Sequence, residues 1–366
     1  MCFNHIENHE FEAPLLEAAN ISVQGDKGPL ISNISLTLRK KGSLSIIGPS
    51  GSGKTTLLKA LAGLVPICSG SLRMNGLNIE KTQPGQRSMG FVFQGFSLFP
   101  NMRVVDNVAF GLESRGISRC QRREIAMDSL KWAGLEHLAQ RWPAALSGGE
   151  SQRIALLRAL AYEPEIILLD EPLSGVDTSS RGPLLELIMD LPVSRNIAVI
   201  FVGHDLDEAY ATGENTLLLR NGQTEACSSR EQMFKKPSTL FAARFMGFEN
   251  ILNMNALSQG QANGYAAFRP ESALIETVHI LSSETMEKND SDPEIFCFEQ
   301  FRKDNSLQVR ATVTSISEGI SRTRINLRVL EESVAVSLPC HLKTDLEPGA
   351  DVIIRVPSIA LSLFAQ

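Results

Sequence analysis

The sequence predicts an α/β protein with a parallel sheet in its first part and a small all-β barrel in its last part. Up to about residue 236, short apolar runs such as 166–169 and 198–202 alternate with segments of helical periodicity, which is the order of strands joined by crossover helices. These runs are apolar throughout, as strands covered on both faces are. Beyond residue 237, apolar and polar residues alternate over short segments, a pattern typical of antiparallel strands.

The length of 366 residues favours two domains over one. We expect a first domain over residues 1–236, with a helical subdomain at about 95–160, and a second domain over residues 237–366. Besides the strands at 166–169 and 198–202, we expect two more strands in the first domain, at 44–47 and 91–93, and two helices, at 55–63 and 121–140. In the second domain we expect a helical connector at 241–248, strands at 324–329 and 352–356, and a polar loop at 282–294.

The composition argues against a nucleic-acid-binding or membrane-spanning protein. The formal net charge is −6, and no block of Lys or Arg supplies a local attraction to nucleic acid. The N-terminus is polar and lacks the apolar stretch of a signal peptide, and the longest apolar runs are too short to cross a bilayer. The six cysteines form no C-x-x-C pair, which suits a reducing compartment. We therefore expect a soluble protein whose role at a membrane would come through a partner.

A glycine-rich segment lies between the strand expected at 44–47 and the helix expected at 55–63, and it fits the pattern G-x-x-x-x-G-K-[ST]. Glycines let backbone N–H groups turn inward around phosphate oxygens, and the helix start adds a partial positive charge. Lys54 would reach the outer phosphates, and the Thr55 hydroxyl would ligate Mg²⁺. The predicted phosphate-binding residues are Gly48, Pro49, Ser50, Gly51, Ser52, Gly53, Lys54, Thr55 and Thr56.

A second signal is the apolar run 166–169, which ends in Asp170 and is followed by Glu171. The carboxyl ends of parallel strands share one edge of the sheet, where the phosphate loop also lies. There Asp170 would orient the Mg²⁺ shell, directly or through water, and Glu171 would polarise the attacking water. A solvated acidic turn after a strand is the common alternative, and the phosphate loop upstream is what favours catalysis.

The third signal is the start of a helix at Ser147, Gly148, Gly149 and Glu150. An open helix start with two glycines is a second anion site, whereas the same residues taken alone would be a plain N-cap. The residues by themselves leave open why one chain carries two such sites.

Together these residues resemble the ATP-binding subunit of an ABC transporter. Residues 147–150 resemble its signature loop, and residues 166–171 resemble its Walker B strand. Gln94, Asp177 and His204 resemble the glutamine of the Q-loop, the aspartate of the D-loop and the switch histidine. The motifs stand in the family's order within the first 236 residues.

The resemblance implies a P-loop NTPase fold of the ABC type that uses ATP and Mg²⁺. It implies catalytic roles for Glu171, His204 and Gln94, and ligation of the metal by Thr55, Gln94 and Asp170. Two subunits pair head to tail in this family, so the signature loop of one copy caps the ATP held by the phosphate loop of the other. The pair of subunits then closes and opens as its equilibrium between the two states shifts, because the pair has different affinities for ATP and ADP.

The resemblance also implies partners and a location. An importer subunit of this kind drives a separate integral-membrane permease at the cytoplasmic face of the inner membrane, and it meets an external solute-binding protein only indirectly. No nucleic acid is expected. The stretch 95–100, with Phe96 and Phe99, would line a groove for a permease helix. The alternative is that these rings are core residues, which we favour for Phe99.

Residues from 237 onward resemble, more loosely, the C-terminal OB-type (TOBE-like) regulatory domain of one importer subgroup, with an Arg-Pro-Glu turn at 269–271. That subgroup serves importers of sugars, polyamines, ferric iron, sulfate, molybdate and tungstate. The stretch 247–251 favours an inorganic anion such as molybdate, tungstate or sulfate, or ferric iron, and a sugar or a polyamine is the alternative. Four arginines form either an anion site or, as we expect, the solvated face of strands: Arg310, Arg322, Arg324 and Arg328.

Three positions depart from the family's pattern. No aromatic residue stands near Gly25, where one usually stacks on adenine, so we expect a weaker apolar contact from Val23. Gly175 replaces a small non-glycine residue, which predicts a more flexible D-loop. Glu150 replaces the more frequent Gln, a change that the family tolerates.

Two other classes of protein stay open. An ABC ATPase without a transport role would carry two motor cassettes, as translation members do, or a long coiled coil, as repair members do, and the sequence shows neither. An anion-sensing regulatory protein would not need the intact set of Lys54, Thr55, Asp170, Glu171 and His204.

Overall fold

The computed structural model of the chain describes residues 13–95, 98–254, 264–277, 306–319, 321–339, 346–357 and 360–364. The chain divides into two compact units, Met1–Arg230 and Glu231–Gln366, which we describe separately. The boundary predicted between the two domains, after residue 236, lies within the second unit and stays a prediction. The loop expected at 282–294 and Phe96 lie outside the described residues. None of the helices in the described part of the chain has both the length and the apolar character that a membrane span needs.

The first unit is built on a six-stranded sheet with the order β10-β9-β3-β8-β7-β6. All neighbours pair in parallel except β10, which runs antiparallel to β9. Every residue of β3, β7 and β8 is buried, and this confirms the prediction of a parallel sheet covered on both faces. The strands are β3 (Ser43–Ile47), β6 (Met89–Val92), β7 (Ile166–Asp170), β8 (Ala198–Val202), β9 (Asn215–Arg220) and β10 (Gln223–Ser229).

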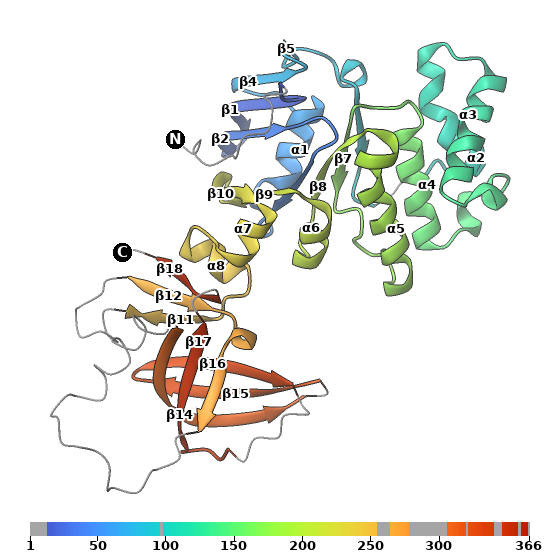
Figure 1. The fold of residues 1–366 in the computed structure, drawn as a ribbon. Helices are drawn as coiled ribbons and strands as arrows, with labels where there is room; N and C mark the ends of the chain where they lie inside the picture. The colour runs from blue at the N-terminus through green and yellow to red at the C-terminus, as the bar shows by residue number, and fades with distance from the viewer. Residues whose placement is uncertain are drawn as a thin grey trace, which may run out of the picture. The chain divides into compact units, whose positions relative to one another are not determined.

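The two faces of this sheet contribute to two different cores. In β7, Ile166 and Leu168 join one core, while Ile167 and Leu169 join the other, as the alternation of side chains along a strand requires. The first core also contains helix α1 (Lys54–Ala62) and an antiparallel sheet of order β2-β1-β4-β5 (Figure 1). That sheet consists of β1 (Leu16–Gly25), β2 (Gly28–Leu38), β4 (Ser69–Met74) and β5 (Leu77–Asn78).

A group of helices forms the rest of the first unit. Helices α2 (Val104–Ala109), α3 (Arg119–Trp132) and α4 (Gly148–Leu160) share a core of their own, and Figure 1 shows them side by side. The helix expected over 121–140 ends early, at Trp132, because Gly134 turns the chain with φ +68°. Further along the chain come α5 (Thr178–Asp190), a π-helical turn (Leu191–Arg195) and α6 (Leu206–Thr212).

Helix α7 (Arg230–Lys235) begins at the boundary between the units, and the second unit continues with α8 (Leu240–Phe245) and then as antiparallel sheet. A three-stranded sheet has the order β11-β12-β18, and a five-stranded sheet, strongly curled in Figure 1, has the order β13-β17-β14-β15-β16. Both contribute to one apolar core, so the predicted small OB-like barrel is confirmed as a curled, barrel-like arrangement. The strands are β11 (Asn250–Asn253), β12 (Tyr265–Phe268), β13 (Leu274–Thr277), β14 (Ser306–Glu318), β15 (Arg322–Val329), β16 (Glu332–Pro339), β17 (Asp351–Pro357) and β18 (Ser362–Phe364).

Candidate functional site

Four neighbouring parallel strands end at one edge of the central sheet, and each is followed by a predicted site element. In spatial order, β3 leads into the phosphate loop, β8 into His204, β7 into Asp170 and Glu171, and β6 into Gln94. The register aligns Ile46 with Val202 and Val202 with Asp170. The strand order therefore gathers residues that are more than a hundred positions apart in the sequence.

The phosphate loop depends on glycine at two positions where the backbone is crowded. Gly48 has φ +148°, and a Cβ there would lie 2.3 Å from the carbonyl oxygen of Leu219. Gly53 has φ +98°, and a Cβ there would lie 2.6 Å from Ile31 Cγ2. Both positions need a residue without a side chain. The tip of the loop, from Pro49 to Gly51, is exposed.

The start of α1 presents unpaired donors to this loop. The N-cap residue is Gly53, and no side chain among the described residues caps the helix, so the first-turn amides lack the partners that a cap would supply. Lys54 Nζ donates to the carbonyl oxygens of Gly48 and Pro49 at 2.8 and 2.9 Å. The Ser52 hydroxyl is buried and has no hydrogen-bond partner in the described part of the chain. Donors of this kind fit the oxygens of a phosphate group.

Burial is the largest cause of the pKa shifts of Lys54 and Asp170. Desolvation lowers the pKa of Lys54, and the negative charges of Glu171 and Asp170 oppose that shift. Desolvation also raises the pKa of Asp170; the Thr55 hydrogen bond opposes this, and the charge of Glu171 adds to it. Thr55 Oγ1 donates to Asp170 Oδ1 at 2.9 Å. A hydroxyl and a carboxylate side by side are the hard oxygen ligands that Mg²⁺ prefers.

Glu171 is held by groups from the two adjacent strands. Its backbone N–H donates to the carbonyl oxygen of Val202 at 2.9 Å, and its φ of +48° is unusual for a residue with a side chain. Gln94 Nε2 donates to Glu171 Oε2 at 2.8 Å, and His204 Nδ1 lies 3.8 Å from the same oxygen. A carboxylate oriented in this way by an amide, beside an imidazole, can position and polarise a water molecule.

The start of α4 differs from the prediction of an open anion site. Ser147 and Glu150 form a capping box, in which each side chain accepts a hydrogen bond from the backbone N–H of the other residue. The prediction of an open helix start is therefore wrong for the backbone N–H groups of Ser147 and Glu150, which both have acceptors. The amides of Gly148 and Gly149 keep no intrahelical partner. No hydrogen bond or ion pair among the described residues joins residues 147–150 to the phosphate loop of the same chain.

Two contacts that the sequence analysis missed join the N-terminal part of α4 to α5 and to the D-loop, and a third caps α5. Gly149 lies so close to Ser180 of α5 that a Cβ would be 2.4 Å from the Ser180 Cβ. Gln152 Nε2 donates to the carbonyl oxygen of Ser174 at 3.3 Å. Asp177 caps α5 by accepting from the Ser180 backbone N–H at 3.1 Å. The contacts of Gly149 and Gln152 are non-local, and no sequence pattern predicts them. Within the same loop, Gly175 adopts φ +73°, so glycine there suits the backbone.

The expected contact of Val23 with adenine is wrong, because Val23 is fully buried in the core of the first unit. Leu30, on the neighbouring strand β2, is 48% exposed instead. Its carbonyl oxygen is 3.2 Å from where a Gly53 Cβ would stand, and its Cγ is 2.9 Å from where a Gly25 Cβ would stand. Leu30 is therefore an exposed apolar side chain beside the phosphate loop. The alternation along β2, with Ile31 buried, was the signal for it.

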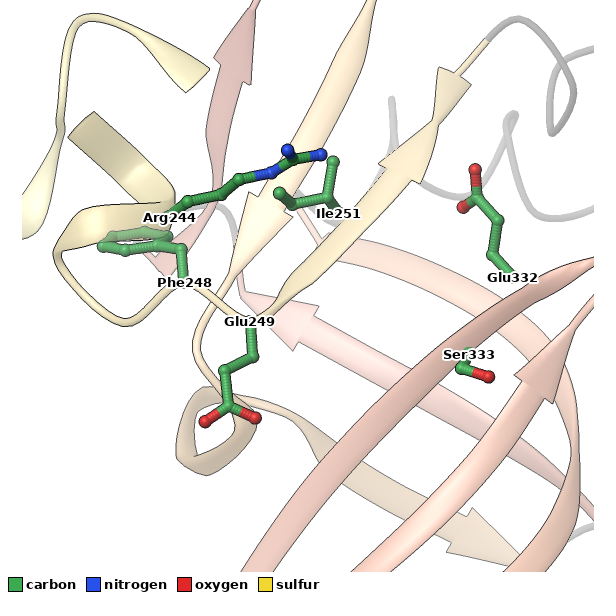
Figure 2. Close-up of a pocket in the computed structure, with 6 residues that line it drawn as sticks. All are labelled: Arg244, Phe248, Glu249, Ile251, Glu332 and Ser333. Atoms are coloured by element: carbon green, nitrogen blue, oxygen red, sulfur yellow. The ribbon is translucent and has the colours of Figure 1, made fainter. Parts of the chain in front are cut away.

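The second unit has a cavity of about 400 Å³, which Figure 2 shows between α8, β11 and β16. Its lining residues are Arg244, Phe248, Glu249, Ile251, Glu332 and Ser333. Glu249 pairs with Arg324 at 2.6 Å, and Glu332 accepts from the backbone N–H of Asn253 at 3.1 Å. Because the lining carries charges of both signs and Glu249 is already paired, the cavity has no clear preference for an anion.

Two of the four arginines considered as an anion site also pair with carboxylates. Arg324 pairs with Glu249, as above, and Arg310 pairs with Asp351 at 2.9 Å. Arg322 and Arg328 are exposed on β15. This arrangement agrees with the expectation of a solvated strand face.

Comparison with known proteins adds a family likeness. A family model described as "ABC transporter" matches residues 31–174. The Fe(3+) ions import ATP-binding protein FbpC of Agrobacterium fabrum is 38% identical over 229 residues, which is 63% of this chain and 65% of that protein. FbpC of Photobacterium profundum is 34% identical, over 70% of this chain and 78% of that protein. The spermidine/putrescine import ATP-binding protein PotA of Aggregatibacter actinomycetemcomitans is 34% identical, over 70% of this chain and 69% of that protein.

Solved structures resemble the first unit. The dimeric ATP-binding cassette MJ0796 in a post-hydrolysis state, bound to ADP and Pi, matches with a TM-score of 0.54 and 30% identity, over 59% of this chain and 98% of that chain. CbiO1 from Clostridium perfringens matches with a TM-score of 0.57 and 25% identity, over 61% of this chain and 91% of that chain. With the first of the import proteins above, FbpC of Agrobacterium fabrum, the alignment covers just under two thirds of the relative's length.

Proposed function

The chain belongs to the family of ABC transporter ATP-binding proteins, and from this we propose that it is the ATP-hydrolysing motor subunit of an importer. The observation that carries the proposal is the sheet edge where Lys54, Thr55, Asp170, Glu171 and Gln94 are joined by hydrogen bonds and close charges. A protein that only bound phosphate would not need the oriented carboxylate of Glu171.

The proposed chemistry assigns one task to each residue. Lys54 exchanges its bonds to loop carbonyls for the outer phosphates of ATP, and the first-turn amides of α1 hold the other phosphate oxygens. Glu171 polarises the attacking water, and Gln94 keeps the Glu171 carboxylate in place. His204 reaches the outer phosphate. Mg²⁺, when bound by Thr55, Gln94 and Asp170, supplies positive charge that offsets the negative charge developing on the phosphate oxygens.

A second copy of the chain completes the proposed site. The signature loop has no polar contact with the phosphate loop of its own chain among the described residues, so it is free to cap a nucleotide held by another copy. The dimeric state of the similar cassette MJ0796 supports this arrangement. The nucleobase would rest on Leu30, which takes the place of the missing aromatic side chain.

The remaining partners follow from the relatives' names. We propose an integral-membrane permease as the direct partner, at the cytoplasmic face of the inner membrane, and an external solute-binding protein as an indirect one. Phe110 is 42% exposed and packs in a tilted arrangement against the half-buried Phe99, at 4.3 Å between ring centroids; this supports a docking groove for a permease helix. Ferric iron is the proposed cargo, since FbpC proteins import it, and a polyamine is the second candidate, as for PotA.

The test is the ATPase activity of the purified chain with Mg·ATP. Glu171→Gln should lower turnover at least about hundredfold and should preserve ATP-dependent pairing of two copies. Glu165→Gln, the same change next to the opposite end of β7, should leave turnover unchanged. A chain that ignores Mg·ATP would overturn the proposed function, and normal hydrolysis by Glu171→Gln would overturn the role of Glu171. ATP-driven uptake of ferric iron or spermidine, measured with the reconstituted permease, would decide the cargo.

A further inference from the structure

Glu150 combines a structural and an electrostatic role at the start of α4. The Ser147 backbone N–H donates to Glu150 Oε2 at 2.7 Å, and the Glu150 backbone N–H donates to Ser147 Oγ at 3.2 Å. This capping box stabilises the first turn. It also fixes a carboxylate beside the free amides of Gly148 and Gly149, on the turn proposed to meet the phosphate held by the other copy.

The carboxylate is ionised at neutral pH. The hydrogen bond from the Ser147 backbone lowers the pKa of Glu150 and burial opposes this, while the Ser147 side chain, Arg141 and Arg153 add to the lowering. A negative charge at a helix N-terminus offsets the partial positive charge that makes such a terminus attractive to anions. The capped turn is therefore a weaker phosphate site than the same turn with a neutral cap.

The turn cannot easily move away from an approaching phosphate. Gly149 packs against Ser180, and Gln152 is bonded to the carbonyl oxygen of Ser174. These contacts join the first turn of α4 to α5 and to the D-loop, so a shift of the carboxylate would disturb both. Repulsion between the Glu150 carboxylate and a phosphate would therefore remain in a closed pair of copies.

We propose that Glu150 limits the stability of the ATP-bound dimer: its carboxylate keeps the signature loop in shape and repels the outer phosphate bound to the other copy, so the copies separate more readily than with a neutral residue. The inference rests on the proposed function. Glutamine at this position isolates the charge, because Gln keeps the length of the side chain and an acceptor oxygen for the Ser147 N–H.

The experiment compares Glu171→Gln with Glu171→Gln/Glu150→Gln, in the full chain with Mg·ATP. Sedimentation velocity gives the dissociation constant of the dimer at low salt and at about 1 M salt. We expect the second variant to dimerise about fivefold more tightly per site, and thus about 25-fold more tightly for the two equivalent sites of a symmetric dimer. The gain should become smaller at about 1 M salt, which screens the part of the repulsion that is exposed to solvent.

Thermal unfolding without nucleotide separates this role from a purely structural one. Glu150→Gln replaces a charged cap with a neutral one, so the melting temperature should stay the same or fall slightly. A purely structural role would then weaken the dimer as well. Glu124→Gln, the same loss of charge on α3, serves as the control and should not alter dimerisation. If Glu171→Gln itself fails to pair with ATP, the proposed function fails; if it pairs and Glu150→Gln leaves that pairing unchanged or weaker, this inference fails.

Discussion

Replacing Gly149 with alanine should destabilise the first unit, because this residue of α4 lies directly against Ser180 of α5. An alanine Cβ would lie 2.4 Å from Ser180 Cβ and 2.5 Å from Ser180 Oγ. Ser180 Cβ is attached to the backbone and cannot rotate away, so one of the helices would have to shift. The shift would also disturb the cap that Asp177 provides to α5 through Ser180.

Two opposing effects determine how much Gly149→Ala changes the free energy of unfolding. Overpacking at a tight contact costs about 1–3 kcal/mol, and alanine in place of glycine returns about 0.5–1 kcal/mol within a helix. The free energy of unfolding should therefore fall by about 1–2 kcal/mol. Gly148 is the matched control, since a Cβ there would meet no atom within 4 Å. Gly148→Ala should be neutral or slightly stabilising.

Urea unfolding followed by tryptophan fluorescence measures this change in the relevant unit. The chain has two tryptophans, and both, Trp132 and Trp142, belong to the first unit. Ser180→Gly removes the two atoms that the new Cβ would meet. The Ser180→Gly background should therefore remove the overpacking cost of about 1–3 kcal/mol from Gly149→Ala. An equal cost in both backgrounds would refute the steric explanation.

Two further predictions concern the D-loop and the buried carboxylate. Gly175→Ala should cost about 1 kcal/mol, because the φ of +73° there is unfavourable for any residue with a Cβ. Gly148→Ala, where φ is not positive and a Cβ would meet no atom within 4 Å, should instead be neutral or slightly stabilising, and an equal loss for both variants in urea unfolding would refute this. Asp170→Asn should stabilise the nucleotide-free chain at pH 7: burial raises the pKa of Asp170 above 3.8, so its ionisation costs stability above the folded-state pKa, and the cost vanishes as pH falls through it. A stability difference that stays constant between pH 7 and pH 4 would contradict this.

The local chemistry of the candidate site was predictable, but its spatial order was not. The apolar runs at 166–169 and 198–202 predicted buried parallel strands, and the glycine pattern predicted the phosphate loop. The chain order of the strands is β3, β6, β7, β8, while their order in the sheet is β3-β8-β7-β6. This reversal places His204 between the phosphate loop and Glu171. Nothing in a one-dimensional pattern specifies which parallel strand lies beside which.

Two predictions, the end of one helix and the adenine contact of Val23, were wrong although the sequence contained a signal for the observed structure. The helix expected over 121–140 stops at Trp132, and the stop signal was Gly134. Val23 was expected to contact adenine because it lies close in the sequence to Gly25, where the family usually has an aromatic residue. The alternation along β1 and β2 instead buries Val23 and exposes Leu30. Side-chain direction in a strand outweighs spacing by count, because neighbouring residues face opposite ways.

The start of α4 shows why a helix terminus has to be analysed together with its cap. The spacing of Ser147 and Glu150 is the S-x-x-E pattern of a capping box, and it was visible in the sequence, yet the two glycines led to the prediction of an open anion site. The same carboxylate that keeps this turn folded before nucleotide arrives lowers its attraction for phosphate afterwards. A motor that must release its partner after each cycle gains from such a compromise, because a tighter dimer would be slower to open. Under this reasoning Glu150→Gln should slow ATP turnover where dimer opening limits the rate, even though it strengthens ATP-dependent pairing.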